Sequence, residues 1–139
     1  MATTTATLTL SSADIADNNI SISNTMTFYT AGTNTGITET TGLARKKTVT
    51  GTNTTLLATG SGIAADVTAD RSAKVYIKNI NDRGDGRKFV TILLQTVEIG
   101  RLYGGDWMLI PWSGGSSNDI EFTASDTTET TLEYTCFYE

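Results

Sequence analysis

Residues 73–94 read AKVYIKNINDRGDGRKFVTILL, and this stretch decides the fold class. Val75 and Ile77 alternate with lysine and tyrosine, and this period of two is typical of a strand with one buried face. The segment 81–86 (NDRGDG) is rich in glycine, aspartate and asparagine, which accept the backbone angles of tight turns. The segment 89–94 (FVTILL) is apolar on both faces and predicts a central strand. We therefore expect two strands here, joined by a turn.

The same period of two extends over most of the chain, and a helical period is almost absent. About one residue in five is threonine, which suits half-exposed strands. We therefore predict an all-β fold, with a single β-sandwich or jelly-roll-like domain over residues 1–139 and an open strand order. The Thr-rich residues 1–12 are expected to form an N-terminal arm. Residues 30–60 are expected to form extended loops or short hairpins.

The residue types present leave little room for catalysis. The chain has no histidine, so the usual general base for a serine or threonine nucleophile is missing. With one cysteine, Cys136, the usual zinc ligand sets are missing too, and no calcium loop pattern is complete. Paired carboxylates on neighbouring strands remain as a catalytic option, but acidic side chains on the exposed face of strands are the ordinary case. We expect no enzyme activity, no metal and no cofactor.

Charge lies in three blocks along the chain, which carries a net charge of −5. Residues 45–101 hold all ten Lys and Arg against five acids, whereas residues 1–44 and 102–139 hold acids alone. The blocks either form separate surfaces or are mixed by interleaved strands. The one basic triplet, Arg45-Lys46-Lys47, is expected to be an exposed loop or a protein contact. Because the chain is acidic overall and has no RNA-binding signature, we expect no nucleic-acid partner.

The N-terminus lacks the basic and apolar regions of a secretory signal, and no apolar run is long enough to span a membrane. A single cysteine cannot form an internal disulfide. We therefore expect synthesis in a cytoplasm and no membrane partner.

Trp107 and Trp112 are five residues apart, so in a straight strand they point to opposite faces. One of them is expected in the core. The other is expected to form an exposed aromatic spot with Tyr103, suited to a subunit interface or a sugar-binding face. The alternative is that both tryptophans are packed inside the domain.

The segments 73–79 (AKVYIKN), 99–111 (IGRLYGGDWMLIP), 120–124 (IEFTA) and 132–134 (LEY) follow one another in a recognisable layout. This layout resembles short all-β virion proteins of tailed bacteriophages, including marine cyanophage types, and covers residues 73–139. The resemblance implies a virion structural role, most often a capsid decoration or cement protein on the outside of the head shell. It implies the major capsid protein or other virion proteins as partners, and a homo-oligomer, for which a trimer is one option.

The alternatives are a tail, neck or fibre component, or a carbohydrate-binding β-sandwich module. The candidate contact residues are Thr7, Leu8, Leu10, Arg45, Lys46, Lys47, Tyr103, Trp107 and Trp112.

Overall fold

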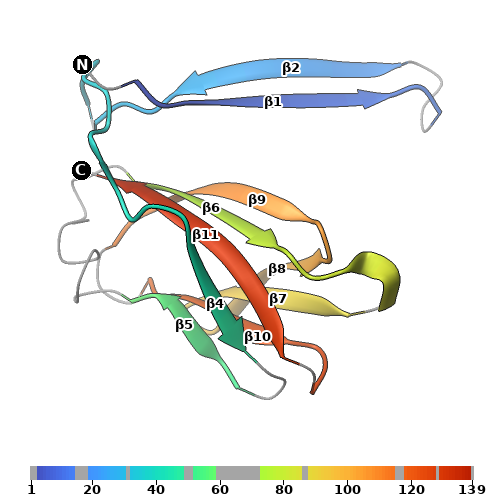
Figure 1. The fold of residues 1–139 in the computed structure, drawn as a ribbon. Coiled ribbons are helices and arrows are strands. Elements are labelled where there is room, and N and C mark those ends of the chain that lie inside the picture. Colours follow the sequence, from blue (N-terminus) through green and yellow to red (C-terminus); the bar gives the residue numbers. More distant parts are fainter. Residues whose placement is uncertain are drawn as a thin grey trace.

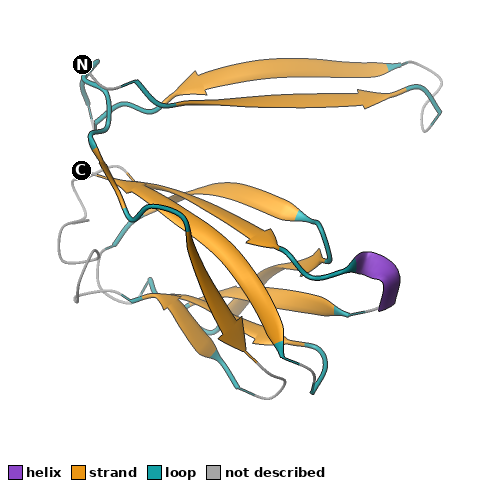
Figure 2. Cartoon of the chain, viewed as in Figure 1, coloured by secondary structure: helices purple, strands orange, loops and turns teal. Residues whose placement is uncertain are grey.

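A computed structural model describes residues 3–14, 19–30, 32–48, 52–58, 73–85, 88–114, 118–127 and 129–138. Almost all regular structure in these ranges is β-strand, and one short 3-10 helix is present (Figures 1 and 2). The prediction of an all-β fold is confirmed. The elements are β1 (Thr5–Ser12), β2 (Ile20–Thr27), β3 (Glu39–Thr40), β4 (Ala44–Thr48), β5 (Thr54–Leu57), β6 (Ala73–Asn79), η1 (Arg83–Asp85), β7 (Phe89–Leu94), β8 (Val97–Tyr103), β9 (Trp107–Trp112), β10 (Ile120–Ala124) and β11 (Thr130–Tyr138).

Two antiparallel sheets form a β-sandwich. The four-stranded sheet has the order β5-β10-β7-β8, and the five-stranded sheet has the order β3-β11-β6-β9, with β4 also paired to β11. The strands alternate as the sequence predicts, so every second side chain points between the sheets. The jelly-roll-like alternative stays a prediction. The fully buried centre of the core consists of Val75, Ile77, Val90, Ile92, Ile120, Phe122, Leu132 and Cys136.

The segment 30–60 contributes strands to both sheets. β3 and β4 pair with β11 in the five-stranded sheet, whereas β5 pairs with β10 in the four-stranded sheet. The described parts of this segment form short strands that pair with distant strands, and not the extended loops or local hairpins that were expected. Pairing with a distant strand leaves no local signal beyond the turn residues.

The strands β1 and β2 form a third, two-stranded sheet that stands apart from the sandwich (Figure 1). They pair along their whole length, from Thr5 with Thr27 to Ser12 with Ile20. Residues 5–12, expected to be part of an N-terminal arm, are thus one strand of a hairpin. We call this element the β1–β2 hairpin.

The base of the β1–β2 hairpin is attached to the five-stranded sheet by apolar contact. Phe28 follows β2 directly, is only 2% exposed, and packs edge-on against the ring of Phe137 in β11 at 5.3 Å between ring centroids. Ile37 is equally buried and donates its backbone N–H to the Phe28 carbonyl at 3.0 Å. Among the residues that the structure describes, these contacts attach the hairpin at its base.

Two asparagines join the two sheets at the end of β6. Asn79, only 1% exposed, donates from Nδ2 to the carbonyl of Leu102 in β8 at 2.9 Å. Its Oδ1 accepts a hydrogen bond from the backbone N–H of Asn81 at 3.1 Å. Asn81 in turn donates from Nδ2 to the carbonyl of Thr131 in β11 at 2.9 Å and accepts from the backbone N–H of that residue at 3.2 Å. These amides satisfy backbone groups of both sheets where regular pairing ends.

A two-residue turn joins β7 to β8 without the residues that such turns favour. Gln95 and Thr96 both have positive φ, at 46° and 69°, between the paired residues Leu94 and Val97. This geometry is that of a type I′ turn, in which Asn-Gly is preferred. A β-branched residue such as Thr96 is strained at positive φ.

We expect the double substitution Gln95→Asn with Thr96→Gly to raise the free energy of unfolding by about 1 kcal/mol, because it relieves this strain. Urea unfolding followed by tryptophan fluorescence measures the change. Gly105→Ala is the opposite control: Gly105 has φ 86° and open space around its missing Cβ, so alanine there should destabilise through the backbone alone. A double variant with an unchanged or lower midpoint would contradict the interpretation.

Candidate interaction surface

The β1–β2 hairpin has one hydroxyl face and one apolar face. The register pairs Leu8 with Asn24 and Leu10 with Ile22, so residues of even number share a face on both strands. Apart from Ser12 and Asn24, the apolar face carries Ala6, Leu8, Leu10, Ile20, Ile22 and Met26. The opposite face carries Thr5, Thr7, Thr9, Ser11, Ser21, Ser23, Thr25 and Thr27, and the hydroxyls of Thr7 and Thr25 are hydrogen-bonded at 2.9 Å.

The apolar face is largely uncovered. Leu10 is 48% exposed, and Leu8, Ile20, Ile22 and Met26 are exposed to nearly the same extent. An isolated two-stranded hairpin is marginally stable in water, and a further layer is needed to stabilise it. No residue of β1 or β2 is charged, although the chain as a whole carries a net charge of −5. These properties are typical of a surface that contacts another chain rather than solvent.

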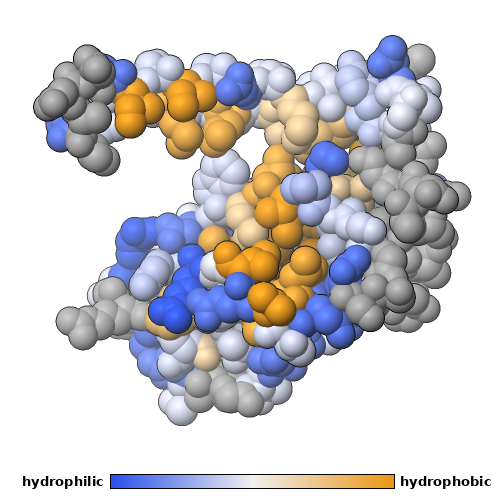
Figure 3. Space-filling model, turned by 180° about the vertical axis from the view of Figure 1, so that it is seen from behind, coloured by the Kyte–Doolittle hydropathy of each residue, from blue (hydrophilic) through white to orange (hydrophobic). Residues whose placement is uncertain are grey.

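The apolar face turns toward the sandwich and forms one wall of an open groove. Figure 3 shows apolar residues along the side of the hairpin that faces the sandwich, with a hollow beneath them. The groove has a volume of about 850 Å³, and β9 provides its other wall. This space is far larger than the voids of a close-packed protein interior, which rarely exceed a water molecule. It can therefore admit a further segment of chain. Its principal apolar lining residues are Leu8, Leu10, Met26, Trp107, Met108 and Leu109.

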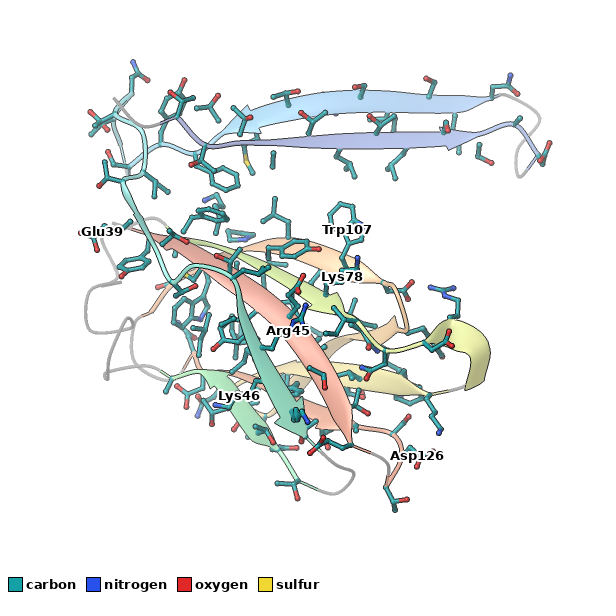
Figure 4. The ribbon with its side chains drawn as sticks, in the orientation of Figure 1. Glu39, Arg45, Lys46, Lys78, Trp107 and Asp126 are labelled. Atoms are coloured by element: carbon teal, nitrogen blue, oxygen red, sulfur yellow. The ribbon has the colours of Figure 1, made fainter. Side chains whose placement is uncertain are left out.

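Trp107 lies where the groove meets the outer face of the five-stranded sheet. Its side chain rises from β9 toward the hairpin in Figure 4 and is 50% exposed. The registers place Arg45, Glu133, Lys78 and Trp107 opposite one another across β4, β11, β6 and β9, so they form a row on the outer face. Arg45 donates to one carboxylate oxygen of Glu133 from Nε and Nη2, at 3.2 and 3.1 Å. The row joins a charged end at β4 to an aromatic end at β9.

The prediction that one tryptophan is buried and the other exposed is confirmed. Trp112 is only 5% exposed and donates its indole N–H to the Asn118 carbonyl at 2.7 Å. The expected partner of the exposed tryptophan is wrong. Tyr103 lies in β8 of the other sheet and packs against Phe89 at 5.5 Å, whereas the aromatic neighbour of Trp107 is Tyr76, at 6.3 Å.

Sequence reasoning missed Tyr76 because its place beside Trp107 depends on the β6–β9 register. Burial, and secondarily the nearby Glu133 carboxylate, raise the pKa of Tyr76, so its phenol is neutral near pH 7.

The basic triplet is not a loop. Arg45, Lys46 and Lys47 lie within β4, where the side chains of Arg45 and Lys47 pair with Glu133 and Glu129 on the outer face. These contacts are solvent-exposed, so each contributes little to stability. They also show that the basic and C-terminal acidic blocks are mixed, since Lys88 and Asp126 make another such pair. Interleaved strands therefore keep these blocks from forming separate surfaces.

The residues that the structure describes contain no group of three or more His, Cys, Asp or Glu side chains placed to hold a metal ion. Burial raises the pKa of the Cys136 thiol to about 12, so the buried sulfur is protonated near neutral pH. The described ranges also include no helix of sufficient length and apolar character to cross a bilayer.

The predicted contact residues fall into three places. Leu8, Leu10 and Trp107 meet at the groove, whose lining also includes Thr7. The triplet 45–47 lies in β4, across the five-stranded sheet from β9. Tyr103 lies in the other sheet beside Phe89, and Trp112 is buried. Of the principal apolar lining residues, Met26, Met108 and Leu109 were not predicted. Their signal was the alternation in 20–28 and the apolar run 107–112. The β1–β2 register is needed to place Met26 on the face of Leu8 and Leu10, and the position of the hairpin over β9 is needed to bring Met108 and Leu109 to the same groove.

Comparison with protein-family models, with curated proteins and with solved structures finds no match to this chain.

Proposed function

We propose that the protein is a structural protein of a tailed-phage virion, acting as a decoration protein on the outside of the head shell. The observation that carries this proposal is the β1–β2 hairpin. Its two strands are uncharged, its apolar face is exposed, and its base is attached to a small β-sandwich. A protein built in this way is completed by contact with another chain, as is usual for components of an assembly.

The resemblance of residues 73–139 to short all-β virion proteins indicates that this assembly is a phage particle. The outer face of the five-stranded sheet offers a second contact region, because Arg45 and Lys47 are exposed and an acidic surface could compete for them with Glu133 and Glu129. We infer that the hairpin and this face both lie against neighbouring chains in the particle.

Quantitative mass spectrometry of purified virions, scaled to the major capsid protein, tests the proposal. A copy number comparable with that of the capsid subunits is expected for a decoration protein. A small fraction of that number would instead place the protein in the neck, tail or fibres. Absence from the particle would overturn the virion proposal altogether.

The exposed Trp107 beside Tyr76 favours a second candidate, a carbohydrate-binding module. Sugars stack on exposed aromatic rings, and these two rings lie 6.3 Å apart on an accessible face. Tryptophan fluorescence titrated with a glycan panel distinguishes this candidate, since Trp107 is exposed and Trp112 is buried. Saturable quenching that is lost in Trp107→Ala would favour the module, and a flat response would exclude the tested sugars.

A further inference from the structure

The exposed apolar face of the β1–β2 hairpin needs a covering layer, and the chemistry of the hairpin restricts which molecule can supply it. Both strands lack charge, whereas the chain carries a net charge of −5 that makes copies repel one another elsewhere. The paired strands, as distinct from the connection 13–19 with Asp14 and Asp17, are thus a surface on which two copies can meet without placing like charges in contact. Its apolar face is also complementary in chemistry to itself, which suits a two-fold contact.

We propose that the hairpin of a second copy of this chain packs on the apolar face of the β1–β2 hairpin and enters the groove beside β9, reciprocally, to form a two-fold clasp. The proposal deepens the proposed function by naming the chain that covers the hairpin, but it rests only on the hairpin and groove. Leu8, Leu10 and Ile22 of one copy then contact their equivalents in the other, and the hydroxyl face of each hairpin lies against the Trp107 wall of the other copy.

The area that such a contact buries favours the clasp over simple stacking of hairpins. At 3.4 Å per residue and 4.8 Å between strands, two strands of eight residues offer a face of roughly 260 Å². Apolar face on apolar face would bury about 500 Å² in total, the size of a fortuitous contact. At the same spacings the six residues of β9 offer roughly 100 Å², so if each hairpin also covers the β9 wall of the other copy the total rises to about 900 Å², close to the lower limit for a specific interface.

An interface of this size predicts weak association that depends strongly on concentration. Free copies should exchange between monomer and dimer, and copies held close together on a surface should pair more completely, because their effective concentration is higher. Sedimentation velocity of the purified full chain, over about a hundredfold range of concentration, should show this equilibrium.

A pair of double variants tests where the copies meet. Leu8→Asp with Leu10→Asp should leave the protein monomeric at the highest concentration. Val97→Asp with Ile99→Asp is the matched control: it places the same charges at alternate, exposed apolar positions, but on β8 of the four-stranded sheet. This control should dimerise as the unaltered chain does.

Because the aspartates in β1 could unfold the hairpin, a cysteine pair supplies a test that leaves it intact. Asn24 lies mid-strand on the apolar face, and Thr25 lies beside it on the hydroxyl face. Asn24→Cys should form a disulfide between copies under mild oxidation, whereas Thr25→Cys should not, because the clasp separates the two Thr25 positions. Cys136 is the chain's one native cysteine and is buried, so the introduced thiol is the reactive one.

A monomer at all concentrations, or equal crosslinking of Asn24→Cys and Thr25→Cys, would overturn the clasp. If the protein is nevertheless abundant in virions, a shell protein covers the hairpin and the proposed function stands. Dimerisation of a protein that is absent from virions would support the clasp and overturn the virion role.

Discussion

Replacing Asn79 by alanine should lower the free energy of unfolding by about 3 kcal/mol. The substitution removes the hydrogen bond to the Leu102 carbonyl and the acceptor of the Asn81 backbone N–H, and the site is only 1% exposed. Each of these backbone groups is then left without its partner in a buried region, which costs more than the net value of the hydrogen bond itself. The loss of side-chain volume adds to the effect.

Urea unfolding of Asn79→Ala should be compared with Asn24→Ala, the same change at an exposed position of the hairpin. The control should unfold within about 0.5 kcal/mol of the unaltered chain. Equal midpoints for the two variants would show that the asparagine pair does not hold the sheets together.

Replacing Gly104 by alanine should destabilise the fold by about 2 kcal/mol, for a purely steric reason. A Cβ at this position would lie 2.6 Å from the Asn81 carbonyl oxygen and 2.7 Å from the backbone nitrogen of Arg83. Both atoms belong to the backbone of the segment that follows β6, so no side-chain rotation relieves the contact. The turn after β8 or the segment around η1 has to move, which also disturbs the Asn81 hydrogen bonds to Thr131.

Gly100→Ala is the matched control for this effect. Gly100 lies in the adjoining strand β8, and no atom lies within 4 Å of the Cβ that alanine would add. We expect its unfolding midpoint to stay equal or rise slightly, because alanine lowers the conformational entropy of the unfolded chain. If Gly104→Ala unfolds at the same urea concentration as Gly100→Ala, close packing at Gly104 is not a constraint on the fold.

The strands of the sandwich were predictable where one residue in two is buried. Val75 and Ile77 in β6 and the doubly apolar β7 lie in the core as their patterns predict. The opposite environments of Trp107 and Trp112 follow from the same period. These features depend on the local alternation of apolar and polar residues, which can be read from the sequence alone.

Other parts of the fold depend on contacts that local patterns do not encode. β8 was not predicted because the turn before it, Gln95-Thr96, lacks the glycine or asparagine that marks a type I′ turn. The roles of β3 and β4 depend on pairing with β11, some ninety positions away, as in the Thr40–Thr135 hydroxyl contact with its separation of 95. Predicting the groove would have required the β1–β2 register and the position of the hairpin over β9. The sequence analysis therefore selected Leu8, Leu10 and Trp107 but did not predict that they line one groove.

The place of β11 also sets the order of events in folding. This strand pairs with β6 on one side and with β3 and β4 on the other, and all three precede it in the chain. The sandwich therefore cannot close until β11 has been synthesised, and closure through such distant contacts is expected to take milliseconds to seconds. The pairing of β1 with β2 is local and can form within about 1–10 μs, although it becomes stable only once a further layer covers it. A newly made chain thus presents its apolar hairpin well before its own sandwich is complete, and crowded chains are exposed to premature association during that interval.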